Sequence, residues 1–142
     1  MLDVHIATGI AVLALSLIAG VWGGVAWIRH RPTVGFWYAL RAMQTVVVLQ
    51  VAFGSILLLS GRNADTGLHY LYGVLPLLVS LGAEALRVGI ADRELEGLDF
   101  DSLPIDRRRT IALAITRRET GAMAVAALVI FLLALRAAGT AG

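Results

Sequence analysis

The chain has 142 residues, of which 58% are hydrophobic, and its mean hydropathy is +0.81. It contains no cysteine, which excludes disulfides, iron–sulfur clusters, thiolate metal sites and covalently attached c-type haem. The net charge of +2 comes from arginines divided among several connecting segments, so we do not expect nucleic acid as a partner.

Four apolar runs are long enough to cross a bilayer, and each predicts a helix. We expect these helices at about 4–28, 36–60, 68–90 and 120–135. The first three exceed the roughly 20 residues that cover the hydrocarbon core, whereas the fourth would need snorkelling of Arg136 or the turns before it. The sequence therefore predicts an all-α, multi-pass protein of the cell membrane. Residues 1–142 would form a single transmembrane domain, an up-down-up-down four-helix bundle.

The arginines are distributed unequally about these helices. In a four-helix bundle, the start of the first helix, the second connection and the C-terminus lie on one side of the membrane. Of the 12 basic residues, only Arg62 and Arg136 fall on that side. The others flank the first and third connections, and the positive-inside rule then predicts an N-out, C-out orientation. Asp3 and the lack of a basic N-terminal region argue against a cleaved signal peptide. His30, between two arginines, is expected to be a loop residue at the inner side.

The third connection is acidic and is followed by Pro104, which suits the first turn of a helix. We expect residues 105–116 to form a short interfacial amphipathic helix that leads into the last span. The alternative is that these residues are an early part of the fourth helix.

A repeat links the first and third helices. His5-x-x-x-Gly9 opens the first helix and His69-x-x-x-Gly73 opens the third. The match continues at the same offset, with Leu13, Ser16 and Leu17 corresponding to Leu77, Ser80 and Leu81. We therefore expect these two helices to run in parallel, related by a pseudo-twofold axis along the membrane normal.

The repeated histidines are the strongest candidate cofactor ligands. Both should lie near the outer ends of parallel helices, so a planar cofactor could have one imidazole on each side. We predict one b-type haem with His5 and His69 as the axial iron ligands. Gly9 and Gly73 lie one turn inward on the same helix faces and would leave room for the porphyrin edge.

The outer arginines and two alternatives complete this candidate site. Arg62 and Arg136 could bind the haem propionates, or could be ordinary interfacial arginines. The glycines could instead serve close helix packing, with the histidines facing water. A divalent metal could also be held by the histidines with Asp3 and Asp65.

One further acid lies inside a predicted span. Glu84 is expected to pair with Arg41 or Arg87, because charges inside membranes need partners. A proton or quinone site is the alternative. Gln50 and Gly54 share one face of the second helix, where a glutamine can hydrogen-bond to a neighbouring helix.

Two of these motifs resemble a known family. Gln50-x-x-x-Gly54, then Leu59-Ser60-Gly61, then Leu68-His69 resembles the haem A synthase family, in which a Gln-x-x-x-Gly helix precedes a loop and a ligand histidine. The His5 helix resembles that family's other ligand helix. Members usually have eight spans in two four-helix halves, and the chain resembles one half or a compact form. The resemblance covers Asp3 to about Leu81 and implies a haem-holding bundle.

The resemblance has one clear departure. The family's Glu-x-x-His-Arg motif, whose Glu matters for oxidising haem O to haem A, is missing, since Met1-Leu2-Asp3-Val4 precedes His5 and Ile6 follows it. We therefore predict a membrane b-type cytochrome for electron transfer or a related oxidoreductase activity. Its partners would be an external redox protein or a membrane quinol, in a homo-oligomer or a larger membrane complex. The alternatives are a haem A synthase-like enzyme and a structural subunit without haem.

Overall fold

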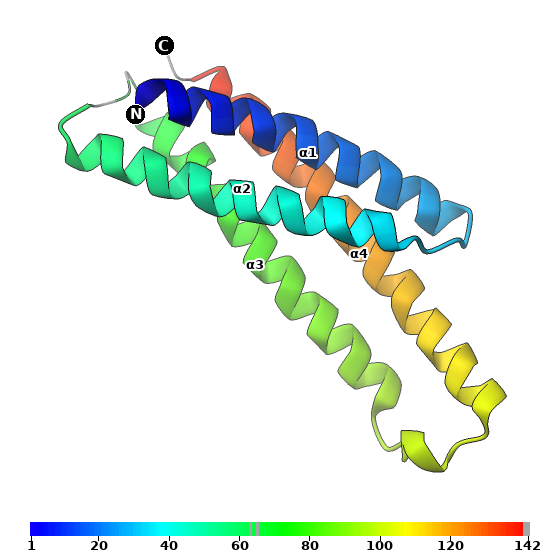
Figure 1. Ribbon diagram of the computed structural model, residues 1–142. Helices are drawn as coiled ribbons and strands as arrows, with labels where there is room; N and C mark the ends of the chain where they lie inside the picture. Colours follow the sequence, from blue (N-terminus) through cyan, green and yellow to red (C-terminus); the bar gives the residue numbers. More distant parts are fainter. Residues whose placement is uncertain (63, 65, 141–142) are drawn as a thin grey trace.

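The computed structural model describes residues 1–62, 64 and 66–140 and consists of helices (Figure 1). The four long helices are α1 (Leu2–Ile28), α2 (Val34–Leu59), α3 (Gly67–Leu95) and α4 (Ile105–Ala138). A short 3-10 turn, η1 (Phe100–Ser102), lies in the last connection. Each long helix is long and apolar enough to cross a membrane. The predicted all-α, four-helix, multi-pass fold is thus confirmed.

The helices form two antiparallel hairpins that cross each other. Helix α1 packs between α2 and α4, α3 packs along α4, and α2 meets α3 over a much smaller region. The start of α1, the end of α2, the start of α3 and the end of α4 lie together at one end (Figure 1). We call this the terminal end of the bundle. The connections α1–α2 and α3–α4 lie away from it and are well separated from each other (Figure 1).

The outside of the bundle is strongly apolar. Ile10, Leu78 and Leu132, from three different helices, are 62%, 56% and 61% exposed. Such exposure would be unfavourable in water but suits contact with lipid tails. The lipid bilayer is therefore the environment that these helices fit.

Glycine allows three helices to approach closely near the end of α1 and the start of α2. A Cβ atom on Gly23 of α1 would lie only 2.4 Å from Cε2 of Phe36 in α2 and 2.9 Å from Cβ of Ala124 in α4. Phe36 is fully buried in the core. Small residues at helix contacts are typical of membrane bundles, in which packing replaces the hydrophobic effect as the driving force.

The second hairpin is longer than the sequence suggested. Residues 105–116, expected as a separate interfacial helix, are the first turns of one continuous α4. Pro104 precedes this helix, and no glycine or proline interrupts it before Gly121. At 1.5 Å per residue, the 34 residues of α4 span about 51 Å, more than the hydrocarbon core requires. Arg118 of α4 forms an ion pair with Glu94 of α3 in this extended part.

Three helices are followed by a residue with a left-handed backbone. The φ angles are 52° at His30, 79° at Gly61 and 71° at Gly97. After α1 and α2, the next amide N–H donates to the carbonyl five residues earlier, at 3.0 and 3.1 Å, which is the Schellman arrangement. Glycine is the usual residue at this position because it has no Cβ, so His30 is the exception.

Candidate functional site

The terminal end of the bundle brings the two repeated histidines together. His5 lies in the first turns of α1 and His69 at the start of α3, and both are partly buried. Their ring centroids are 6.2 Å apart, with an angle of 67° between the ring planes. The two hairpins cross here, so residues 64 positions apart in the sequence become neighbours.

A backbone carbonyl orients the imidazole of His69. Nδ1 of His69 lies 3.1 Å from the carbonyl oxygen of Ala137, in the last turn of α4. A carbonyl oxygen only accepts, so Nδ1 carries the proton and donates it. The same oxygen also accepts from the backbone N–H of Thr140 at 3.1 Å and from the Thr140 hydroxyl at 2.9 Å, so the helix end and the imidazole share one carbonyl. The Nε2 lone pair of His69 is therefore available to a ligand or a metal.

Two polar side chains orient the imidazole of His5. The hydroxyl of Thr8 contacts Oε1 of Gln50, which turns the Gln50 amide nitrogen towards His5. This nitrogen lies 3.3 Å from Nε2 of His5. Because the amide N–H donates, Nε2 of His5 accepts and Nδ1 carries the proton. Both histidines are thus held in the same tautomer, with the lone pair on Nε2.

The other nitrogen of His5 has no partner within the described part of the chain. Its Nδ1 atom is buried and makes no hydrogen bond there. The ring lies against Gly54 of α2, where a Cβ would be 3.1 Å from Cε1 of His5. A larger residue at position 54 would push the imidazole away, so the Gln50-x-x-x-Gly54 motif both bonds and accommodates this histidine.

The two repeat glycines have different surroundings. A Cβ on Gly9 would lie 3.2 Å from Nε2 of Gln50, so this glycine accommodates the glutamine amide rather than bordering open space. For Gly73, none of the described residues has an atom within 4 Å of the position that its Cβ would take. Free space for a cofactor edge is therefore present beside Gly73 and not beside Gly9.

The remaining predicted site residues lie at the same end. The guanidinium of Arg136 lies 5.8 Å from the centroid of the Tyr72 ring, and Arg62 is exposed just after α2. Neither arginine forms an ion pair with the residues that the structure describes. Of the alternative metal ligands, Asp65 lies outside the described residues, and the described ones contain no group of three or more His, Cys, Asp or Glu that could hold a metal ion.

The sequence did not reveal the residues that orient the histidines. Gln50 contacts a neighbouring helix as predicted, but its particular partner, His5, is set by the rotation of α2 against α1. Thr8, three residues after His5, lies on the same face of α1, but a single threonine in an apolar helix does not indicate which side chain it contacts. The Ala137 carbonyl carries no sequence signal, since every residue has one.

The acid inside the bundle is fully paired. The carboxylate of Glu84 accepts from Arg41 at 2.6 Å, from Gln44 at 2.8 Å and from Arg87 at 3.0 Å. Arg87 also lies over the ring of Trp37, 5.7 Å from its centroid. These contacts join α2 to α3 where the two helices otherwise meet little. Both predicted ion pairs of Glu84 are therefore present, and a structural role accounts for them.

Comparisons with protein-family models, with curated proteins and with solved structures find no match for this chain. The resemblance to the haem A synthase family therefore stays a prediction from the motifs.

Proposed function

We propose that this chain is a membrane cytochrome that holds one b-type haem between His5 and His69. The observation that supports the proposal best is the 6.2 Å separation of the two ring centroids. With metal–nitrogen bonds of about 2 Å, two imidazoles on opposite sides of one iron have centroids roughly 6 Å apart. The centroid separation of the two histidines is therefore compatible with shared ligation of one iron.

The chemistry of the donor atoms also fits an iron porphyrin. Axial ligation uses a neutral imidazole lone pair, and the partners of His5 and His69 leave that lone pair on Nε2 in both rings. The Nδ1–H···O=C bond of His69 is the outer contact that typically orients a metal-bound histidine. For His5 to bind the iron through Nε2, the Gln50 amide must move away from this atom.

The surroundings supply space and positive charge. The open side of Gly73 would accept a porphyrin edge, and Arg62 and Arg136 would bind the propionates at the terminal end. If both His5 and His69 bound the iron, no position would remain for oxygen. When bound, the haem would supply one-electron transfer. A membrane quinol or an external redox protein is then the expected electron partner.

We infer from the arginines that the terminal end faces outward, giving an N-out, C-out protein of the cell membrane. All arginines except Arg62 and Arg136 belong to the connections or helix segments away from that end. We also propose a pseudo-twofold relation between α1 and α3, on the basis of the repeated His-x-x-x-Gly register and the parallel direction of the two helices. The oxidation of haem O is not proposed, because Leu2 and Ile6 replace the charged residues of the family's motif.

A visible spectrum of the detergent-purified chain, expressed with ample haem, tests the proposal. We expect a six-coordinate, low-spin spectrum. His5→Ala and His69→Ala should each lose the haem or leave it five-coordinate and high-spin. His30→Asn is the matched control, because it removes a histidine at the other end and asparagine tolerates a positive φ. A chain without Soret absorption would refute the proposal and leave the structural-subunit alternative.

A further inference from the structure

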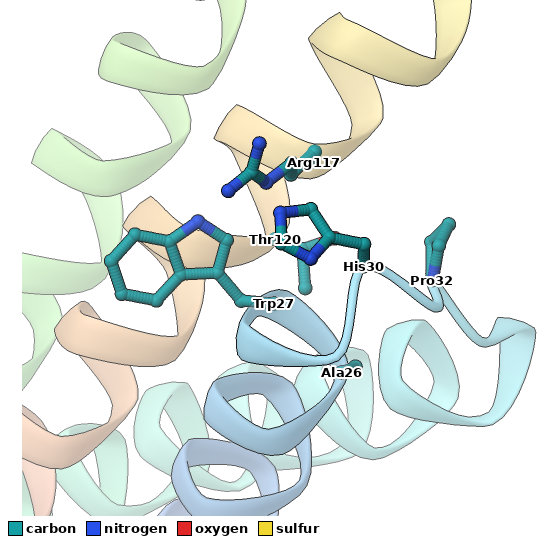
Figure 2. Close-up of a pocket in the computed structure, with 6 residues that line it drawn as sticks. All are labelled: Ala26, Trp27, His30, Pro32, Arg117 and Thr120. Carbon is teal, nitrogen blue, oxygen red and sulfur yellow. The ribbon is translucent and has the colours of Figure 1, made fainter.

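A second group of side chains lies far from the histidine pair, where the end of α1 contacts the middle of α4. Figure 2 shows Trp27 from the end of α1, His30 from the connection that follows it and Arg117 from α4 around a small pocket, with Ala26, Pro32 and Thr120 completing its wall. A neighbouring groove of about 310 Å³ is lined by Trp27, Ala114, Arg117 and Arg118. Because Trp27 and Arg117 line both spaces, we treat them as one site, the Arg117 groove.

The wall of the Arg117 groove is formed by a closely packed indole. A Cβ on Gly121 of α4 would lie 2.7 Å from Cε2 and 2.8 Å from Nε1 of Trp27. Only glycine at position 121 lets the Trp27 ring lie directly against α4. The ring still remains 41% exposed, so its outer part is available to a ligand. Tryptophan with one apolar and one polar edge is typical of the membrane–water interface.

His30 contributes an imidazole at a position where the backbone favours glycine. Its φ of 52° matches the left-handed residues after α2 and α3, which are Gly61 and Gly97. A residue with a Cβ is disfavoured in this conformation, although histidine adopts it more often than most other residues. The His30 side chain lines the pocket beside Arg117.

The charge of the groove is positive. Among the described residues, two arginines and no carboxylate line it. Arg118 is paired with Glu94 of α3. Arg117 is exposed and makes no ion pair with any residue in 1–62, 64 and 66–140. An anion would therefore find one free guanidinium, a second arginine beside it and an indole wall.

We propose that the Arg117 groove binds the phosphate of an anionic phospholipid, with Arg117 as the principal contact. The planar guanidinium suits a phosphate because it can donate two parallel hydrogen bonds. Basic pockets between membrane helices on the cytoplasmic side are typical sites for anionic headgroups. The groove opens beside an interfacial tryptophan on an apolar bundle, where a lipid is the nearest source of phosphate. This site is separate from the histidine pair and does not depend on the haem proposal.

Native mass spectrometry of the purified full chain, titrated with phosphatidylglycerol or phosphatidylcholine, tests this site. We expect one tightly retained phosphatidylglycerol and much weaker retention of phosphatidylcholine. Arg117→Gln should weaken phosphatidylglycerol binding about fivefold to tenfold, the effect of one interfacial cation. Arg109→Gln changes the net charge equally on the same helix, outside the groove, and should change binding less than twofold. Equal losses in the two variants, or equal binding of the two lipids, would overturn the proposal.

Two further measurements separate the remaining explanations. Inorganic phosphate at millimolar concentration should not displace phosphatidylglycerol; displacement that depends on Arg117 would instead assign the groove to free phosphate and overturn the lipid assignment. His30→Gly relieves the strained backbone but removes the imidazole. It should raise the melting temperature and weaken phosphatidylglycerol binding, and unchanged binding would contradict the role given to His30.

Discussion

The contact between Gln50 and His5 gives a quantitative test of the haem proposal. In the structure, the Gln50 amide donates to Nε2 of His5, the atom that would ligate the iron. Haem binding must then break this hydrogen bond. One interhelical hydrogen bond in a membrane protein contributes about 0.6 kcal/mol on average and about 1.7 kcal/mol at most. Gln50→Met keeps the length of the side chain and removes the bond. Haem affinity should therefore rise about threefold, with an upper limit of about 20-fold.

Soret titration of the apo-protein in detergent measures this change as a ratio of Kd values. The Thr8 hydroxyl keeps an acceptor in the variant, because it also lies 3.0 Å from the carbonyl oxygen of Val4. Gln44→Met is the matched control, since Gln44 is the other glutamine of α2 and binds Glu84 instead. It should leave the haem affinity unchanged. Weaker haem binding by Gln50→Met would refute the reasoning, because the amide would then support the ligand rather than compete with the iron.

Two more predictions compare glycines that have free space beside them with glycines that do not, and a third concerns the orientation in the membrane. Gly73→Leu should reduce haem retention, measured by Soret absorption, without lowering the melting temperature of the apo-protein. Gly82 also has no described atom within 4 Å of its Cβ position, and Gly82→Leu should change neither haem retention nor the melting temperature. Gly23→Ala should lower the free energy of unfolding by about 1–3 kcal/mol through overpacking. Gly24 has no described atom within 4 Å of its Cβ position, so Gly24→Ala should leave the free energy of unfolding unchanged or raise it. Equal effects of the two substitutions, measured by circular dichroism, would contradict the packing. Reporter fusions after Arg31 should indicate the cytoplasm and fusions at the C-terminus the exterior, and a cytoplasmic C-terminus would refute the orientation.

The structure also changes the interpretation of the repeat. Equal spacing of histidine and glycine suggested equal surroundings, but Gly9 faces Gln50 and Gly73 faces open space. Spacing within one helix fixes which residues share a face, because the helix has 3.6 residues per turn. It does not fix what the neighbouring helix places against that face, so identical motifs can have different partners.

The sequence by itself determined the number of spans, the all-α class and the two histidines that meet. These depend on hydropathy, run length and a repeated register, which are local properties of the chain. Hydropathy underestimates the lengths of α3 and α4 at the end where they are connected, because charged residues end an apolar run without ending a helix. Residues 105–116 show this: hydropathy separates them from the last span, but residues 105–120 contain no glycine or proline that would end the helix.

Only the tertiary structure decided how the histidines are oriented and where the second site lies. The Ala137 carbonyl beside His69, the Gln50 amide beside His5 and the Trp27 ring on Gly121 are contacts between different helices. Each depends on the rotation and crossing of two helices, which side-chain packing over the whole bundle sets and no short motif encodes.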